Sequence, residues 1–293
     1  MTIDAPLARR LVAAQFPHWK DLAIRPVEND GHDNRTFRLG ADKSIRLPSH
    51  PRYEAQVEKE QLWLPRLAPC LPFPIPTPLE MGVPSSDYPL KWSVYGWIEG
   101  RIASRVQGHD LFALAESLAE FLLALQSVDT EGGPGPGPHN FHRGGPLAFY
   151  ERETIQAISE LGTEIDGEGA QSVWEAAVSA PEPVRATWLH GDLSASNLLV
   201  DDAGLKAVID FGICGVGDPS CDLKMAWMFF DQPSRELLRD RLRLDEPTWA
   251  RGRGWALWKS LKTLAEGLRA GGTGVAEARR WVDEIVFDHR PRA

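Results

Sequence analysis

Three oxygen-bearing side chains near residue 200 have the types and spacing needed to hold a metal ion and a phosphate chain. Asp192 precedes Asn197 by five residues, and Asp210 follows an apolar segment at 205–209. That segment and the apolar residues 198–200 are joined by the turn sequence DDAG, which favours a hairpin that returns Asp210 to the neighbourhood of Asn197. Mg²⁺ prefers carboxylate and amide oxygens combined with substrate phosphates. The segment therefore predicts a site for Mg²⁺ and a nucleotide.

A purely structural interpretation of the same residues is also open. Asp192 and Asn197 could cap and tighten a turn, as Asp and Asn often do. That interpretation leaves the carboxylate of Asp210 after its strand unexplained. His190, two residues before Asp192, is interpreted as a buried scaffold that hydrogen-bonds the loop rather than as a proton-transfer group. We therefore retain the chemical interpretation for the three oxygen-bearing residues.

The segment resembles the catalytic loop and metal-binding motif of the aminoglycoside phosphotransferase family, which is related to protein kinases and includes macrolide phosphotransferases. The likeness rests on HGD at 190–192 followed by Asn197, on IDFG at 209–212, and on GDPSCDL at 217–223. It covers nearly the whole chain. The resemblance implies an α+β fold of the protein-kinase-like two-lobe type, with a small β-rich N-lobe and a larger helical C-lobe.

The resemblance also implies a role for each of the three residues. Asp192 corresponds to the catalytic aspartate that accepts or orients the proton of the attacking hydroxyl, and Asn197 and Asp210 would hold Mg²⁺. The nucleotide-binding N-lobe is expected at residues 1–97. The C-lobe, with the catalytic loop and the substrate-binding helices, is expected at residues 98–293.

The implied activity is the ATP- or GTP-dependent transfer of a γ-phosphoryl group to a hydroxyl of a small molecule. An aminoglycoside-type antibiotic, with resistance as the result, is the first expectation for the acceptor. A macrolide, or a metabolite such as choline or an amino sugar, is the alternative, since one fold serves many acceptors. A second class of function is a nucleotide-binding protein without transfer activity. Asp192, Asn197 and Asp210 argue against that class, and the sparse glycines of the N-lobe leave it open.

The third predicted strand carries Arg46 where the resemblance leads us to expect a lysine that holds the α- and β-phosphates. Arginine can bind phosphate through two parallel hydrogen bonds, so the function is not lost. Lys43 is the competing cation, but strand alternation points it to the other face and into solvent. The helix glutamate expected to pair with Arg46 is Glu60, and Glu58 is the alternative.

Two further segments are expected at the nucleotide. The sequence NDGHDNRTF at 29–37 offers Gly31 and Asn34 to the phosphates in place of a glycine-rich loop, or else is an ordinary hairpin turn. Gly96 and Ile98 are aligned with the hinge of the family, whose backbone groups contact the adenine edge.

The resemblance places the acceptor cleft in the C-lobe, at residues 226–231, at the loop around 139–143 and at the helix that carries Trp255 and Trp258. Asp231 could bind an ammonium group and Trp227 could contact the acceptor. The alternatives are that Asp231 is a water-facing carboxylate at a helix end and that Trp227 packs in a helix core. Asp218 and Asp222 are assigned structural roles, in a turn and in the first turn of the next helix.

Hydrophobic periodicity predicts the elements that must position these residues. In the first hundred residues it indicates helices at 5–16 and 52–67, of which Pro65 must end or kink the second, and strands at 24–28, 35–39, 44–47 and 91–98. The proline-rich residues 69–84 are expected to be extended. Later helices are predicted at 110–128, 147–161, 170–180, 220–231, 234–243, 247–270 and 275–287, around a non-helical insertion at 186–218.

The composition of the 293-residue chain, with 43% hydrophobic and 25% charged residues, favours a globular protein of two lobes or small domains. A net charge of −9 disfavours nucleic acid and anionic lipid as partners. The longest apolar run, at 225–230, is far shorter than the roughly 20 residues that cross a membrane. The N-terminus lacks a signal-peptide pattern, and the three cysteines suit a reducing compartment. We therefore expect a cytoplasmic protein with neither membrane nor nucleic-acid partners.

Overall fold

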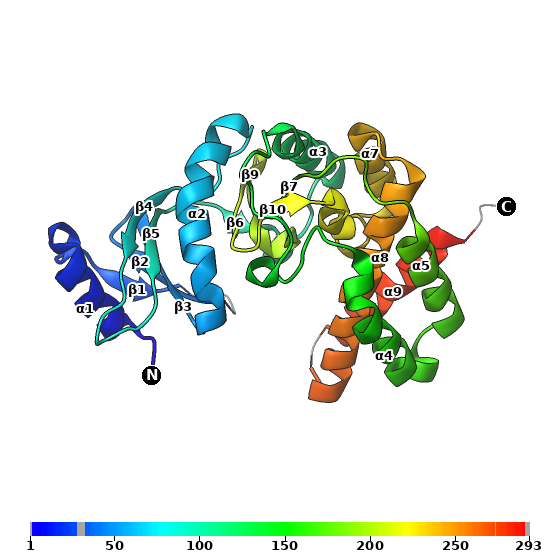
Figure 1. Cartoon of the computed structure of the whole chain (residues 1–293), viewed down its shortest axis with the longest axis horizontal. Coiled ribbons are helices and arrows are strands. Elements are labelled where there is room, and N and C mark those ends of the chain that lie inside the picture. Colours follow the sequence, from blue (N-terminus) through cyan, green and yellow to red (C-terminus); the bar gives the residue numbers. More distant parts are fainter. Residues whose placement is uncertain (1, 28–32, 273, 291–293) are drawn as a thin grey trace.

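The computed structural model, which describes residues 2–27, 33–272 and 274–290, has two lobes that lie side by side (Figure 1). The N-lobe contains an antiparallel sheet, and the larger C-lobe is mostly helical. This architecture confirms the predicted α+β two-lobe fold. The predicted lobe boundary at 97–98 falls between β5 (Trp92–Gly96) of the N-lobe sheet and β6 (Arg101–Ile102), which pairs with a C-lobe strand. In the described part of the chain, no helix is long and apolar enough to cross a membrane.

The N-lobe sheet has the strand order β1-β2-β3-β5-β4. Its other strands are β1 (Ile24–Pro26), β2 (Asn34–Leu39), β3 (Lys43–Pro48) and β4 (Pro78–Gly82). Helix α1 (Ala5–Gln15) covers one face, where Leu7 and Leu11 form a core with Ile45 of β3. Successive strand residues face opposite sides, so Ser44 and Arg46 face away from this core and line a cleft.

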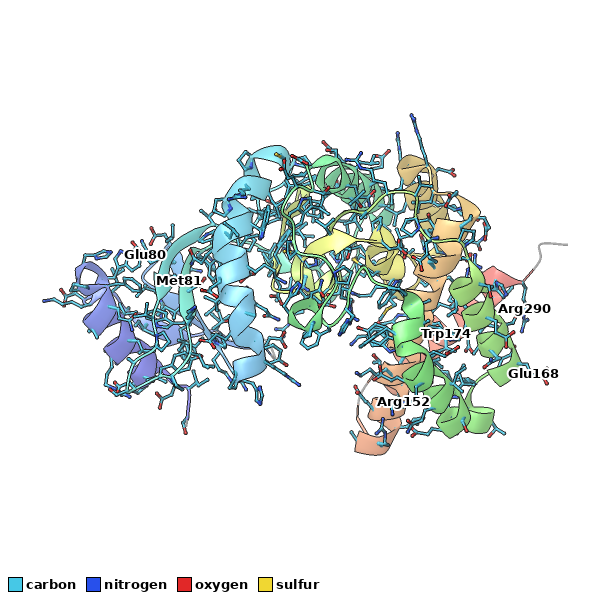
Figure 2. The ribbon with its side chains drawn as sticks, in the orientation of Figure 1. Glu80, Met81, Arg152, Glu168, Trp174 and Arg290 are labelled. Atoms are coloured by element: carbon cyan, nitrogen blue, oxygen red, sulfur yellow. The ribbon has the colours of Figure 1, made fainter. Side chains whose placement is uncertain are left out.

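Helix α2 (Glu54–Leu67) lies between the sheet and the C-lobe (Figure 1). It continues through Pro65, where we predicted an end or a kink. Pro65 lies in the last turn, so its missing N–H removes one helical hydrogen bond and leaves the rest of the helix intact. The proline-rich segment predicted to be extended begins in a 3₁₀ helix at Ala68–Cys70 and then supplies the edge strand β4, which carries Glu80 and Met81 (Figure 2).

The C-lobe is built around α8 (Glu246–Ala270), which packs against α4 (Glu151–Leu161), α5 (Gly167–Ser179) and α9 (Val275–His289). Trp174 of α5, labelled in Figure 2, belongs to this core and is 1% exposed. Two further helices, α3 (Leu111–Ser127) and α7 (Gln232–Leu242), pack against each other. These helices lie close to the predicted ranges, because each one buries an apolar stripe of the kind that periodicity reveals.

The predicted helix at 220–231 is wrong. Residues Pro219–Lys224 form a 3₁₀ helix, and only the single turn α6 (Met225–Met228) is α-helical. The chain breaks at Phe229, whose φ is −137°, and the next residues begin α7. The apolar density of this stretch reflects burial on all sides rather than a regular helical face, so periodicity gave a false signal.

The predicted hairpin is confirmed as β8 (Leu198–Asp201) and β9 (Gly204–Val208), with β6 pairing on its other side. A second pair, β7 (Thr187–Leu189) and β10 (Gly215–Gly217), brackets it in the sequence. The loop between β7 and β8 and the loop between β9 and β10 are therefore held close together. They contain the residues that the sequence analysis singled out.

Candidate functional site

The loop that carries Asp192 is fixed by a buried carboxylate beneath it. Asp222 accepts hydrogen bonds from the backbone N–H groups of His190, at 2.7 Å, and Gly191, at 2.8 Å. Burial raises the pKa of Asp222. Gly191 has φ +84°, and a Cβ there would lie 2.6 Å from the carbonyl oxygen of Ile213, so only glycine fits. Asp222 therefore has the structural role that we assigned to it.

His190 joins this loop to the hairpin. Its Nδ1 accepts the N–H of Asp192 at 3.2 Å, and its Nε2 lies 3.0 Å from the carbonyl oxygen of Ile209. The ring is fully buried and packs against Phe211. With both ring nitrogens engaged by backbone groups, His190 acts as the scaffold that the sequence suggested.

Asp218, the other aspartate assigned a structural role, anchors a different part of the C-lobe. It caps the 3₁₀ helix through Ser220 and lies 2.7 Å from Nε of Arg251, with both side chains buried. This ion pair ties the 3₁₀ helix to α8. Asp218 therefore supports the site without entering it.

Asp192 is paired with a lysine that sequence analysis missed. Nζ of Lys224 lies 3.1 Å from Oδ1 of Asp192, and the Lys224 side chain is 7% exposed while that of Asp192 is 45% exposed. Burial by itself would raise the pKa of Asp192, but the charge and hydrogen bond of Lys224 outweigh it and lower that pKa. Asp192 is therefore an ionised carboxylate with an accessible face. The only available signal for Lys224 in the sequence was its position directly after the residues GDPSCDL at 217–223, in a segment that we predicted to be a helix.

Asn197 is held between the loop and the hairpin. Its Nδ2 donates to the carbonyl oxygen of Asp192 at 2.9 Å, and its own carbonyl oxygen accepts the N–H of Ile209 at 2.9 Å. No hydrogen bond within the described residues reaches its Oδ1. The amide oxygen is therefore free to bind a ligand in the cleft that Asn197 lines.

Asp210 has an unusual backbone, with φ +68°. Such a conformation is uncommon outside glycine, and Asp and Asn tolerate it best. Its Oδ1 lies 2.6 Å from Nη2 of Arg46. The ion pair connects the end of the C-lobe hairpin to β3 of the N-lobe, so the two lobes meet at this carboxylate.

Arg46 also contacts the buried Glu60 of α2, with Nη1 3.5 Å from Oε1. The hydroxyl of Tyr95 donates to Oε2 of Glu60 at 2.6 Å. Burial by itself would lower the pKa of Arg46, but the charges of Asp210 and Glu60 raise it. Burial raises the pKa of Glu60 in spite of Arg46. Arg46 is thus a permanent cation between two acidic groups.

Lys43 and Glu58, the alternatives to Arg46 and Glu60, form ion pairs outside the site. Lys43 pairs with its neighbour Asp42 at 2.8 Å, and Glu58 pairs with Lys91 at the surface at 2.5 Å. The structure therefore brings together Arg46 and Glu60, as predicted, and leaves Lys43 and Glu58 outside the site.

Several of these residues border one cleft of about 920 Å³ between the lobes, a size that suits a nucleotide. Glu60 contacts Arg46 but does not line the cleft. The predicted residues that line it are Asn34, Arg46, Gly96, Ile98, Asp192, Asn197 and Asp210. Gly31 lies outside the described residues. The lining also includes Asp33 and Trp97, which sequence analysis did not select.

The two predicted hinge residues differ in what they offer a ligand. The N–H of Gly96 already donates to the carbonyl oxygen of Thr77 at 2.9 Å, and the N–H of Trp97 donates to the backbone carbonyl oxygen of Asp42 at 2.8 Å. The N–H of Ile98 has no hydrogen bond within the described residues. Ile98 is therefore the residue at which a base edge can find a backbone donor.

The two predicted acceptor residues do not lie in this cleft. Trp227 is 1% exposed and packs against Trp249, with ring centroids 4.5 Å apart. Asp231 caps α7 by accepting the N–H of Ser234 at 3.0 Å. Their structural alternatives therefore describe them better, because one fills the core and the other satisfies a helix end.

The donor set near Asp210 fits a magnesium ion. No group of three or more His, Cys, Asp or Glu side chains that could hold a metal occurs within the residues that the structure describes. Mg²⁺ is usually bound by one or two protein ligands together with substrate phosphates and water. The unpartnered Oδ1 of Asn197 and the carboxylate of Asp210, both lining the cleft, provide such a pair.

Replacing Arg46 with methionine is expected to raise the dissociation constant of Mg·ATP about 10- to 100-fold, because a charge-assisted hydrogen bond contributes about 1.5–3 kcal/mol. Arg46→Lys should raise this dissociation constant less than Arg46→Met does, since lysine keeps the positive charge. Isothermal titration calorimetry measures the affinity of both variants for Mg·ATP, and thermal melting checks that each variant is folded. Lys43→Met, on the opposite face of the same strand, is the matched control and should bind normally. Equal affinities for the Arg46→Met and Lys43→Met variants would contradict the assignment.

The chain is similar to known proteins in sequence family and in fold. The model of the phosphotransferase enzyme family matches residues 23–255. No curated protein sequence matches the chain significantly.

Solved structures of phosphotransferases have the same fold. The GDP complex of aminoglycoside 2'-phosphotransferase-IIIa is 18% identical, with a TM-score of 0.72 over 98% of this chain and 100% of the other. The streptomycin-ATP-APH(2")-IIa ternary complex is 20% identical, with a TM-score of 0.61 over 91% of each chain. The macrolide 2'-phosphotransferase MphH from Brachybacterium faecium is 22% identical, with a TM-score of 0.62 over 99% of this chain and 100% of the other. At these identities the likeness establishes the fold.

Proposed function

The chain belongs to the phosphotransferase enzyme family, and from this premise we propose that it transfers the γ-phosphoryl group of ATP or GTP to a hydroxyl group of a small molecule. The observation that carries the proposal is the convergence of Asp192, Asn197, Asp210 and Arg46 on a single cleft between the lobes. These groups match the recurring parts of phosphoryl-transfer sites, which act mainly by positioning and by electrostatic stabilisation.

The nucleotide is proposed to bind along the N-lobe side of the cleft. Arg46 would contact the phosphates, where its guanidinium can donate two parallel hydrogen bonds. Ile98 would offer its N–H to the base, and Asn34, buried at the start of β2, would approach the phosphate chain. The structural neighbours described as GDP and ATP complexes support a nucleotide donor.

Asn197 and Asp210 are proposed to hold Mg²⁺. When bound, the ion would neutralise negative charge on the phosphates. The residues of the chain supply the rest of the arrangement. Arg46 offsets the charge of Asp210, and the backbone of Asn197 fixes the end of the hairpin relative to the loop of Asp192.

Asp192 is proposed to act on the acceptor. The hydroxyl oxygen of the acceptor attacks the γ-phosphorus, the bond to the β–γ bridging oxygen breaks, and ADP or GDP leaves. Asp192 orients the hydroxyl and takes its proton. The 45% exposed side chain is accessible for this contact, and Lys224 keeps it ionised.

For the acceptor, the aminoglycoside prediction and the macrolide alternative are supported by the neighbouring structures, which are described as phosphotransferases of both kinds. Resistance and a cytoplasmic location remain predictions from the sequence.

The proposal is tested by incubating the purified protein with Mg·ATP or Mg·GTP and a panel of aminoglycosides, macrolides, choline and amino sugars, together with neutral and anionic sugars. We expect release of ADP or GDP that depends on one acceptor class. Failure to bind either nucleotide in the presence of Mg²⁺ would overturn the proposal.

Replacing Lys224 with methionine is expected to move the acidic limb of the pH profile of kcat/KM to higher pH. Burial tends to raise the pKa of Asp192, and the charge and hydrogen bond of Lys224 lower it. Without Lys224 the pKa of Asp192 therefore rises, and the carboxylate is protonated at a higher pH. Lys224→Arg, which keeps the charge, should retain the wild-type limb. Identical limbs for Lys224→Met and the wild type would show that Lys224 does not set the ionisation of Asp192.

A further inference from the structure

Basic side chains gather beside Asp192 outside the nucleotide cleft. They are Arg143, in the loop before α4, Lys224, in the 3₁₀ helix, and Lys259 and Lys262, on α8. Lys259 interacts electrostatically with the other three and with Asp192. None of the four lines the cleft assigned to the nucleotide. The cluster therefore lies where an acceptor would reach the catalytic carboxylate.

Two of these cations are neutralised within the protein. Lys224 pairs with Asp192 at 3.1 Å, and Lys262 pairs with Glu153 at 3.1 Å. Glu153 is held by a second hydrogen bond, from Nε1 of Trp258 at 2.8 Å. Neither lysine has a positive charge left without a partner.

Arg143 forms no ion pair within the described residues, although its charge acts on the nearby carboxylates of Asp192 and Glu153. Its guanidinium carbon lies over the rings of Tyr150, Trp255 and Trp258, at 5.2, 5.3 and 4.6 Å from their centroids. It also donates to the hydroxyl of Tyr150. Aromatic packing fixes the plane of the guanidinium in advance, which favours the binding of a carboxylate or phosphate through two parallel hydrogen bonds.

Lys259 is half-buried, and within the described residues its ammonium group has neither an ion pair nor a hydrogen bond. Burial lowers the pKa of Lys259. Removing an ammonium group from water without a partner is unfavourable, so such groups are uncommon outside functional sites. A ligand with negative charge would compensate both Lys259 and Arg143.

We propose that the acceptor carries an anionic group, a carboxylate or a phosphate, which Arg143 and Lys259 bind while the acceptor hydroxyl lies against Asp192. The inference rests on the proposed function and refines its acceptor. A polycation such as an aminoglycoside would bring like charges next to Arg143 and Lys259, which is unfavourable. The cluster therefore selects a hydroxy acid or a phosphorylated hydroxy compound.

A labelling experiment tests the anion site without knowledge of the acceptor. Pyridoxal 5'-phosphate forms an imine with a lysine amine, with loss of water, and borohydride then makes the bond permanent. The nucleotide cleft is filled with Mg·ADP during labelling, and the modified lysines are mapped by mass spectrometry. Pyridoxal, which lacks the phosphate, is the matched reagent, and Lys206, on the β8–β9 hairpin, is the reference lysine.

We expect the phosphate-bearing reagent to label Lys259 about tenfold or more in excess of pyridoxal, as a charge-assisted contact implies. Arg143→Met should remove this preference, and labelling of Lys206 should be equal with both reagents. Equal labelling of Lys259 by both reagents would overturn the inference.

Turnover with matched acceptors tests the same proposal and shows whether the anionic group of the acceptor is a carboxylate or a phosphate. Glucose, glucuronate, glucose 6-phosphate and kanamycin are compared as acceptors, together with glycerol, glycerate and glycerol 3-phosphate. Activity with the carboxylates or the phosphates, a KM raised about 10- to 100-fold in Lys259→Met, and recovery in Lys259→Arg are expected. Lys206→Met is the control that should behave as the wild type.

The outcomes distinguish the inference from the function on which it rests. Turnover of kanamycin or a neutral acceptor that is unchanged in Lys259→Met would overturn the anionic acceptor and leave the phosphotransferase intact. Loss of Mg·nucleotide binding by the wild-type protein would overturn the phosphotransferase. The labelling result decides the anion site in either case.

Discussion

Replacing Asp192 with asparagine is expected to lower kcat about 10²- to 10⁴-fold while the dissociation constant of Mg·ATP stays nearly unchanged. Asparagine keeps the shape of the side chain but cannot take the proton of the acceptor hydroxyl. The nucleotide contacts assigned to Arg46 and Ile98 are untouched. Single-turnover kinetics and calorimetry measure the two quantities separately.

The control for this substitution must account for Lys224, which forms an ion pair with Asp192 in the wild-type protein. Lys224 is 7% exposed, so its buried charge loses its ion-pair partner once Asp192 is neutral. The double variant Asp192→Asn/Lys224→Met removes that charge and should be as inactive as the single variant while melting at a higher temperature. Asp283→Asn, at an exposed position of α9, should retain full activity. A kcat for Asp192→Asn within a few fold of the wild type would remove Asp192 from the mechanism.

Replacing Asp210 with asparagine is expected to lower kcat/KM at least about 100-fold and to raise the concentration of Mg²⁺ needed for nucleotide binding. Loss of an outer-shell partner of a metal costs about 10- to 100-fold, so loss of a ligand is expected to cost more. Asparagine accommodates the φ of +68° at this position, so the substitution changes charge and leaves the backbone in place.

Magnesium titrations of nucleotide binding provide the measurement for Asp210. The control is Asp202→Asn, an exposed aspartate of the β8–β9 turn that pairs with Arg101, and it should show the wild-type dependence. A magnesium dependence of Asp210→Asn identical to that of the wild type would mean that Asp210 does not hold the ion.

Local sequence signals were sufficient for the parts of the site that a single turn or strand determines. The turn sequence DDAG closes the β8–β9 hairpin, and so the approach of Asp210 to Asn197 could be predicted from spacing alone. Strand alternation likewise separated Arg46 from Lys43, because successive residues of β3 face opposite sides.

The remaining parts depend on contacts between distant segments. Lys224 reaches Asp192 across 32 positions, and Arg143 meets α8 through aromatic rings more than 100 positions later. No periodicity encodes such contacts. The role of Asp231 was left open in the sequence for a related reason, since a carboxylate that caps a helix and one that binds a ligand look alike until the helix start is known.

The fate of the γ-phosphoryl group tests the central claim most directly. With γ-labelled nucleotide, Mg²⁺ and the acceptor class found in the panel, we predict that the label appears on the acceptor hydroxyl with the wild-type protein and is almost absent with Asp192→Asn. Label released only as inorganic phosphate, at the same rate for both proteins and with or without acceptor, would contradict the account.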